Sequence, residues 1–117
     1  MYKLLAAAFA AALFSSDAFP LPRAESAQEC GIAADMAIVA QSLAGERVPP
    51  GKAAAIMARI YDVSESERGR AMMAAILDTA YVRSAVAGAS TDTFAEELFT
   101  TCIKAAGNMD AVLGRTL

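Results

Sequence analysis

Residues 26–45 read SAQECGIAADMAIVAQSLAG and combine a helix start, a long apolar repeat and a helix stop. The start is a capping box, in which the hydroxyl of Ser26 accepts from the backbone N–H of Glu29 and the Glu29 carboxylate reaches back. Small and apolar residues then recur every three or four positions, as on the buried face of a helix; they are Cys30, Ala33, Met36, Ala37, Val39, Ala40, Leu43 and Ala44. Gly45 is a typical C-terminal stop, so the segment predicts a helix over residues 26–44.

The rest of the chain predicts three more long helices, separated by proline, glycine and short polar segments. They are expected at 52–61, 65–87 and 92–106, with a short turn at 108–113 capped by Asn108. Residues 46–51 predict a loop, because Pro49 and Pro50 do not fit a helix interior. Residues 64–67 read SESE and predict a second capping box, with Ser64 as the cap.

Cys30 and Cys102 are the two cysteines of the chain, and both fall on the apolar faces of predicted helices. Cys30 lies near the start of the first helix and Cys102 near the end of the last. In an antiparallel bundle these two ends meet. The sequence therefore predicts an all-α fold over residues 26–113: a small antiparallel four-helix bundle in which one disulfide links the first and last helices.

Two other states of the cysteines stay open at this point. Two free buried thiols are expected if the chain remains in a reducing compartment. A redox-active pair is the third interpretation, although such cysteines usually lie close in sequence, as in Cys-x-x-Cys.

Residues 1–18 read MYKLLAAAFAAALFSSDA and resemble a bacterial secretory signal peptide. Lys3 gives a positive start, an apolar run follows, and small residues precede a cleavage point after Ala18. The run is shorter than the roughly 20 apolar residues that a membrane helix needs. We therefore expect export to the periplasm or the medium and no stable membrane span in the mature chain; the alternative is an uncleaved, membrane-associated N-terminus.

Two short segments flank the predicted bundle of the mature chain. Residues 19–25 contain Pro20 and Pro22, which favour an extended lead because proline restricts both itself and the residue before it. Residues 114–117 form a short tail.

The composition excludes several classes of function. The chain has 10 basic and 13 acidic residues, a formal net charge of −3 and no histidine. Without a basic patch, nucleic-acid binding is not expected. The lack of histidine removes the usual general base, a common zinc and haem ligand, and the side chain that titrates near neutral pH.

Two groups of charged side chains are candidates for chemistry. Asp35 and Asp78 lie in otherwise apolar helical segments and form a possible pair of carboxylates for acid–base work. The simpler interpretation is that each faces solvent or pairs with Arg59 or Arg83. An anion-binding strip is conceivable from Arg68, Arg70 and Arg83, but the nearby acidic residues favour a solvated face of mixed charge.

The methionines are candidates for a soft-metal site or for core packing. They are Met36, Met57, Met72, Met73 and Met109. Core packing is the simpler interpretation, because the neighbouring Met72 and Met73 point about 100° apart on a helix and do not by themselves converge on one metal ion. We therefore predict no catalytic residue, no metal ligand and no cofactor.

Three aromatic residues give the remaining candidate site. Tyr61, Tyr81 and Phe99 are predicted to line a groove for a partner helix or an apolar ligand, unless they complete the core. The sequence thus predicts a small exported binding module, such as a chaperone, adaptor or inhibitor, and not an enzyme. Its partner is expected to be another protein or a second copy in a homo-oligomer. The alternative is a small-ligand carrier or a carboxylate-dependent enzyme.

Overall fold

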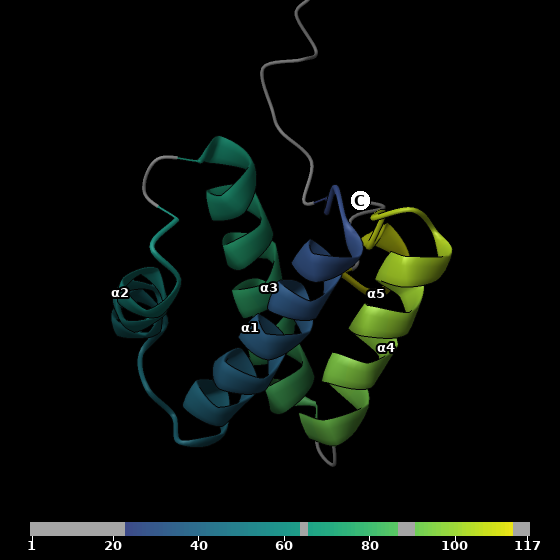
Figure 1. Cartoon of the computed structure of the whole chain (residues 1–117). Coiled ribbons are helices and arrows are strands. Elements are labelled where there is room, and N and C mark those ends of the chain that lie inside the picture. The colour runs from purple at the N-terminus through teal and green to yellow at the C-terminus, as the bar shows by residue number, and fades with distance from the viewer. Residues whose placement is uncertain (1–22, 64–65, 87–90, 114–117) are drawn as a thin grey trace, which may run out of the picture.

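The computed structural model describes residues 23–63, 66–86 and 91–113, and the regular structure of these residues is helical (Figure 1). The helices are α1 (Ala27–Gly45), α2 (Pro50–Tyr61), α3 (Glu67–Ala85), α4 (Thr91–Lys104) and the short α5 (Asp110–Leu113). β-Pairing in this part of the chain is limited to an isolated bridge between Arg23 and Asn108. The all-α prediction is confirmed. The predicted signal peptide, most of the predicted lead and the tail lie outside the described residues.

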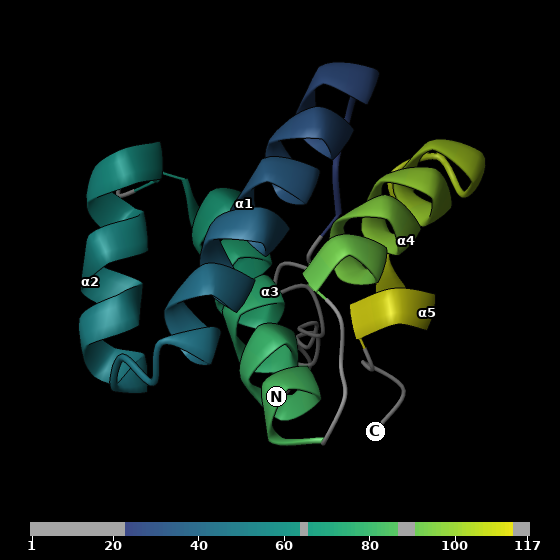
Figure 2. The ribbon, with the colours of Figure 1, turned by 90° about the horizontal axis from the view of Figure 1, so that it is seen from below.

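α1 is the central helix of the bundle. It contacts α2, α3 and α4, while α5 contacts α3 and α4. In Figure 1, α4 runs in the opposite direction to α1, and α3 runs in the same general direction as α1. α2 is seen end-on in Figure 1 and along its length in Figure 2, on the outer side of α1. The antiparallel pairing of α1 with α4 brings the start of α1 to the end of α4.

Most core side chains are alanine and methionine, which come from α1 to α4 and from Ala24 and Met109 in the connecting segments, and α5 adds Leu113. All five methionines for which core packing was predicted are buried, which confirms that interpretation; they are Met36, Met57, Met72, Met73 and Met109. The buried face of α1 carries mostly alanine, which lets α3 and α4 approach its backbone closely. Phe94 and Leu98 of α4 are fully buried in the same core and supply larger apolar volume.

The cap predicted for α1 is confirmed, whereas the one predicted for α3 is wrong by two residues. Ser26 Oγ accepts from the backbone N–H of Glu29 at 3.2 Å. α3 begins at Glu67, and its cap is Ser66, whose Oγ accepts from the backbone N–H of Gly69 at 2.9 Å. Ser64 lies outside the described residues. The shift arises because Val63 and Ser66 form a turn before the helix, with Ser66 N–H donating to the Val63 carbonyl at 3.1 Å.

Other predicted boundaries also need correction. α3 ends at Ala85 and not at 87, because Val86 adopts an extended conformation. α2 begins at Pro50 and not at 52, because proline fits the first turn of a helix, where its missing N–H has no partner to lose. α4 ends at Lys104 and not at 106, because Ala106 adopts a positive φ of 55° and turns the chain. The short turn predicted at 108–113 is present as α5, and Asn108 Oδ1 accepts from the backbone N–H of Asp110 at 2.9 Å.

Gly107 joins the end of α4 to the segment that precedes α1. Its backbone φ angle of 95° is one that residues other than glycine rarely adopt. The backbone N–H of Ala24 donates to the Gly107 carbonyl at 3.0 Å. A Cβ atom at position 107 would lie 1.9 Å from the Ala24 carbonyl oxygen, so a side chain there must displace backbone.

Gly107→Ala is therefore expected to lower the free energy of unfolding by about 2 kcal/mol, from backbone strain and displacement of Ala24. Gly31→Ala is the matched control, because its Cβ would meet nothing within 4 Å on an α-helix. In that variant the free energy of unfolding should rise by about 0.5–1 kcal/mol. Urea unfolding of both variants measures the difference, and equal stabilities would contradict the role given to Gly107.

Candidate functional site

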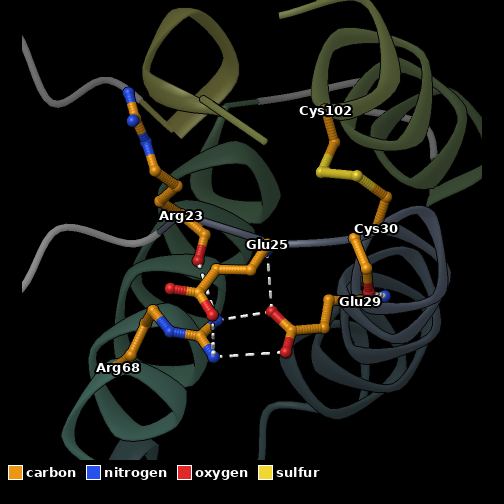
Figure 3. The surroundings of a disulfide bond; sticks show 7 residues. Arg23, Glu25, Glu29, Cys30, Arg68 and Cys102 are labelled. Atoms are coloured by element: carbon orange, nitrogen blue, oxygen red, sulfur yellow. Dashed lines mark hydrogen bonds and ion pairs between the residues drawn. A yellow bond between two sulfur atoms is a disulfide. The ribbon is translucent and has the colours of Figure 1, made fainter. Parts of the chain in front are cut away.

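The disulfide between Cys30 and Cys102 joins the first turn of α1 to the last turn of α4 (Figure 3). The two Cα atoms lie 5.6 Å apart, within the range of protein disulfides. Both cysteines are buried. The predicted pairing and the predicted meeting of these two helix ends are confirmed, so the bond fixes α1 and α4 in register.

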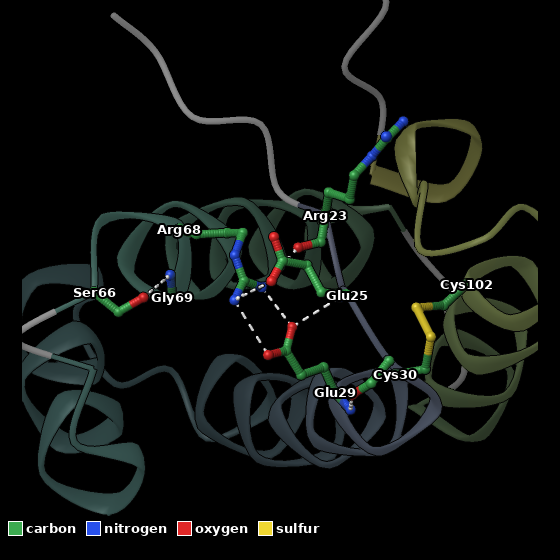
Figure 4. Close-up of polar contacts among 9 residues, drawn as sticks. Arg23, Glu25, Glu29, Cys30, Ser66, Arg68, Gly69 and Cys102 are labelled. Carbon is green, nitrogen blue, oxygen red and sulfur yellow. Dashed lines mark hydrogen bonds and ion pairs between the residues drawn. A yellow bond between two sulfur atoms is a disulfide. The ribbon is translucent and has the colours of Figure 1, made fainter. Parts of the chain in front are cut away.

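A cluster around Arg68 lies beside the disulfide and joins α3 to the start of α1 (Figures 3 and 4). The guanidinium binds both carboxylate oxygens of Glu29, and its Nη2–Oε2 distance is 3.2 Å. Nη1 also donates to the Arg23 carbonyl at 3.1 Å, and Nη2 pairs with Glu25 Oε1 at 3.3 Å. This Arg68 cluster, formed by Arg23, Glu25, Glu29 and Arg68, holds the segment before α1 against α3.

The charges of the Arg68 cluster stabilise each other. The hydrogen bond from Arg68, helped by the backbone N–H of Glu25, holds the pKa of the Glu29 carboxyl below its ordinary value of 4.5, although burial opposes the shift. The hydrogen bond to Glu29 likewise raises the pKa of Arg68. The positive charge of an arginine in the first turn of a helix interacts unfavourably with the positive end of the helix dipole. Its pairing with Glu29 explains why Arg68 stands there.

Glu29→Gln is expected to lower the free energy of unfolding by about 1 kcal/mol near neutral pH, since a partly exposed charged hydrogen bond is lost. The lowered pKa means that the wild-type carboxylate contributes fully above pH 4.5 and loses its contribution as the pH falls through the folded-state pKa. Urea unfolding from pH 7 to pH 3 should show the two proteins converging at acidic pH. A difference in stability that is constant with pH would contradict this.

The three predicted aromatic residues lie in different surroundings. The Tyr61 hydroxyl donates to Asp35 Oδ2 at 2.5 Å, and burial followed by this hydrogen bond raises the pKa of Tyr61. The Tyr81 hydroxyl donates to the Val48 carbonyl, and burial raises the pKa of Tyr81. Phe99, by contrast, is 42% exposed. The two tyrosines use their hydroxyls within the bundle. Phe99 lines one surface hollow and Tyr61 lines a different one, so these two residues do not share a groove.

The two aspartates considered for acid–base work are on different helices. Asp35 on α1 accepts from Tyr61, and Asp78 on α3 is exposed. Arg83 pairs with Glu97 at 3.2 Å, which was not among its predicted partners. Among the described residues, no three His, Cys, Asp or Glu side chains lie close enough together to hold a metal ion.

A row of apolar residues follows the outer side of the contact between α1 and α4. We name as the α1–α4 seam Ala27, Ala34, Phe99 and Ile103, which line hollows that both helices border, together with Gly31 and Ile38, which helical spacing places on the same face of α1 as Ala27 and Ala34. The spacing of four, three and four residues places the α1 members on one face of that helix. Ala34 and Phe99 line one shallow hollow of 890 Å³, and Ala27 and Ile103 line another of 330 Å³ beside the disulfide.

The large side chains of the seam are exposed, as are Ile32, Ile60, Val82 and Val86 elsewhere on the described surface. Ile38 is 54% exposed, Phe99 42% and Ile103 44%. A single exposed apolar residue is ordinary, whereas a contiguous group of them marks an interaction site more often. The exposure of Ile38 and Ile103 was not predicted, although both residues lie off the main apolar stripes of their helices.

Charge is distributed unevenly among the helices of the bundle. α1 contains two acidic residues and no lysine or arginine, and α4 contains three acidic residues and one lysine. α2 and α3 together contain five basic and two acidic residues. The pair of helices that forms the seam is therefore acidic, and the other pair is basic.

None of the helices in the described ranges is both long and apolar enough to cross a bilayer. In comparisons with protein-family models, with curated proteins and with solved structures, the chain shows no match.

Proposed function

We propose that this chain is a small exported helical protein that acts by binding another protein, as a chaperone, adaptor or inhibitor, and has no catalytic role. The observation that carries the proposal is the α1–α4 seam, where Ile38, Phe99 and Ile103 keep large apolar surfaces in water. Exposed apolar area gives a favourable free energy when a partner covers it. A scaffold fixed by a disulfide also loses little conformational entropy when it binds.

Two features support export to the periplasm or the medium. The first 18 residues have the positive start, the apolar run and the small residues of a secretory signal. A buried disulfide between the two cysteines is typical of proteins from oxidising compartments.

Photo-crosslinking of the full chain in the cells that produce it tests the binding role. A photoreactive residue replaces Thr100, next to Phe99, or Ser42, one turn after Ile38; both are exposed. Exposed Ser84 on α3 serves as the comparison position. A covalent adduct with a protein at Thr100 or Ser42 supports the proposal, and an adduct at Ser84 alone would place the binding surface outside the seam. If none of the positions gives an adduct and the native mass of the protein includes a bound small molecule, the proposal is overturned in favour of a ligand carrier.

A further inference from the structure

We infer that residues 23–25 form a strap that shields the Cys30–Cys102 disulfide from thiols, and that the Arg68 guanidinium holds this strap closed. Figure 3 shows the strap beside the disulfide, on the path of the chain into α1. The strap thereby controls how fast the bond can be reduced. This control is independent of the proposed binding role.

The strap is attached to the end of the bundle that the disulfide ties together. The Ala24 N–H donates to the Gly107 carbonyl at 3.0 Å, and the Gly107 N–H donates to the Cys102 carbonyl at 2.7 Å. Arg23 forms the isolated bridge to Asn108. The Ala24 side chain is buried in the same core cluster as both cysteines. The strap and the disulfide therefore link the same two helix ends, the start of α1 and the end of α4.

The approach from solvent to the sulfur atoms runs through the hollow of 330 Å³ beside the disulfide. One wall of this hollow is formed by residues 25–27, and the other by the end of α4 and Gly107. Both cysteines border the hollow, yet Cys30 is only 2% exposed and Cys102 0%. A thiolate must contact a sulfur atom directly to exchange with a disulfide. One wall therefore has to move before the bond can be attacked.

The strap is the part of these walls that moves most easily. The opposite wall includes the last turn of α4. Ser26 is tied to α1, because its carbonyl accepts from the Cys30 N–H at 3.1 Å. Moving either of these parts breaks helical hydrogen bonds. The strap lies outside the helices and is held by side-chain contacts and by the bond from Ala24 to Gly107. Segments of this kind open locally at a lower free energy than helices do.

Arg68 supplies the contacts that keep the strap closed (Figure 4). Its Nη1 donates to the Arg23 carbonyl at 3.1 Å, and its Nη2 pairs with Glu25 Oε1 at 3.3 Å. The same guanidinium binds Glu29 on α1, and Glu29 Oε1 accepts from the backbone N–H of Glu25 at 2.9 Å. These charge-assisted hydrogen bonds join the strap to both α1 and α3, so their loss favours the open strap.

Reduction of the bond follows thiol–disulfide exchange once the strap is open. A thiolate of a dithiol attacks one cysteine sulfur and forms a mixed disulfide, and the other cysteine leaves as a thiolate that takes up a proton. The second thiol of the reductant, deprotonated in turn, displaces the remaining cysteine. The dithiol becomes a disulfide, having supplied two electrons and two protons, and the protein gains two thiols. Because only molecules with an open strap react, the strap delays the loss of the bond that holds α1 against α4.

The rate of reduction by excess dithiothreitol at one fixed pH tests the inference, read by alkylation of the new thiols and intact mass. Arg68→Met should raise the rate about tenfold, because charged hydrogen bonds of the closed strap are lost. Arg83→Met is the matched control: it makes the same change in the last turn of α3, where the pair with Glu97 is lost, and should leave the rate unchanged. Gly107→Ala, whose Cβ would displace Ala24, should also raise the rate.

Urea distinguishes release of the strap from unfolding of the whole protein, and this series uses the wild-type protein. Reduction through a local opening should depend weakly on low concentrations of urea, because little surface is exposed. Three outcomes would overturn the inference: no acceleration by Arg68→Met, equal acceleration by Arg83→Met, or a steep rise of the wild-type rate with urea. Circular dichroism confirms that each variant is folded before the reductant is added.

Discussion

Reduction of the Cys30–Cys102 disulfide is expected to lower the free energy of unfolding by about 4 kcal/mol. The bond joins residues 72 positions apart, and in the chain-entropy model a loop of this length strongly restricts the unfolded chain. A domain of this size has a total stability of roughly 5–15 kcal/mol. The bond therefore contributes a large share of the stability, which urea unfolding with and without reductant measures.

The double variant Cys30→Ala/Cys102→Ala is the control for that experiment. Its stability should resemble that of the reduced wild-type protein and should not respond to reductant. Equal stability of the oxidised and reduced wild-type proteins would contradict the account, because the bond would then add nothing to the packing of α1 against α4.

Phe94→Ala is expected to destabilise the protein by about 3–5 kcal/mol, the usual cost of removing a buried phenylalanine. Phe94 has no exposed surface and lies near the start of α4. The guanidinium of Arg83 lies over its ring, 4.8 Å from the centroid, and Arg83 also pairs with Glu97. Loss of the ring leaves a cavity and removes the cation–π contact that helps to join α3 to α4.

Phe99→Ala is the matched control, because it makes the same change on the same helix at a residue that is 42% exposed. We expect Phe99→Ala to lower the free energy of unfolding by less than about 1 kcal/mol. Thermal unfolding of the two variants should separate them clearly. A similar loss of stability in both would show that Phe99 belongs to the core, and it would remove the central anchor of the proposed binding surface.

The features that sequence predicted well are those with local or periodic causes. The capping box at Ser26 and the apolar stripe of α1 depend on neighbours within one or two turns, so their positions followed from the chain itself. The disulfide followed because both cysteines fell on apolar stripes at helix ends that meet in an antiparallel bundle. The predicted cap of α3 was wrong because residues 64–67 contain two serines, each followed by an acidic residue, and either serine could cap the helix. The turn between Val63 and Ser66 makes Ser66 the cap.

The parts of the candidate site that sequence did not predict depend on contacts between distant residues. Arg68 and Glu29 are 39 positions apart, and their pairing required the relative placement of α1 and α3. An arginine in the first turn of a helix was a signal for such a partner. The grouping of Phe99 with Ile38 and Ile103 likewise depends on how α4 lies against α1, whereas Tyr61 and Tyr81 are engaged by Asp35 and Val48.

The intact mass of the protein recovered from the cells that produce it, read before and after reduction, tests the account most directly. An exported protein with its first and last long helices tied together should have lost residues 1–18, and reduction should add the mass of two hydrogen atoms. A full-length chain whose mass does not change on reduction would contradict both the proposed export and the bond that fixes α1 against α4.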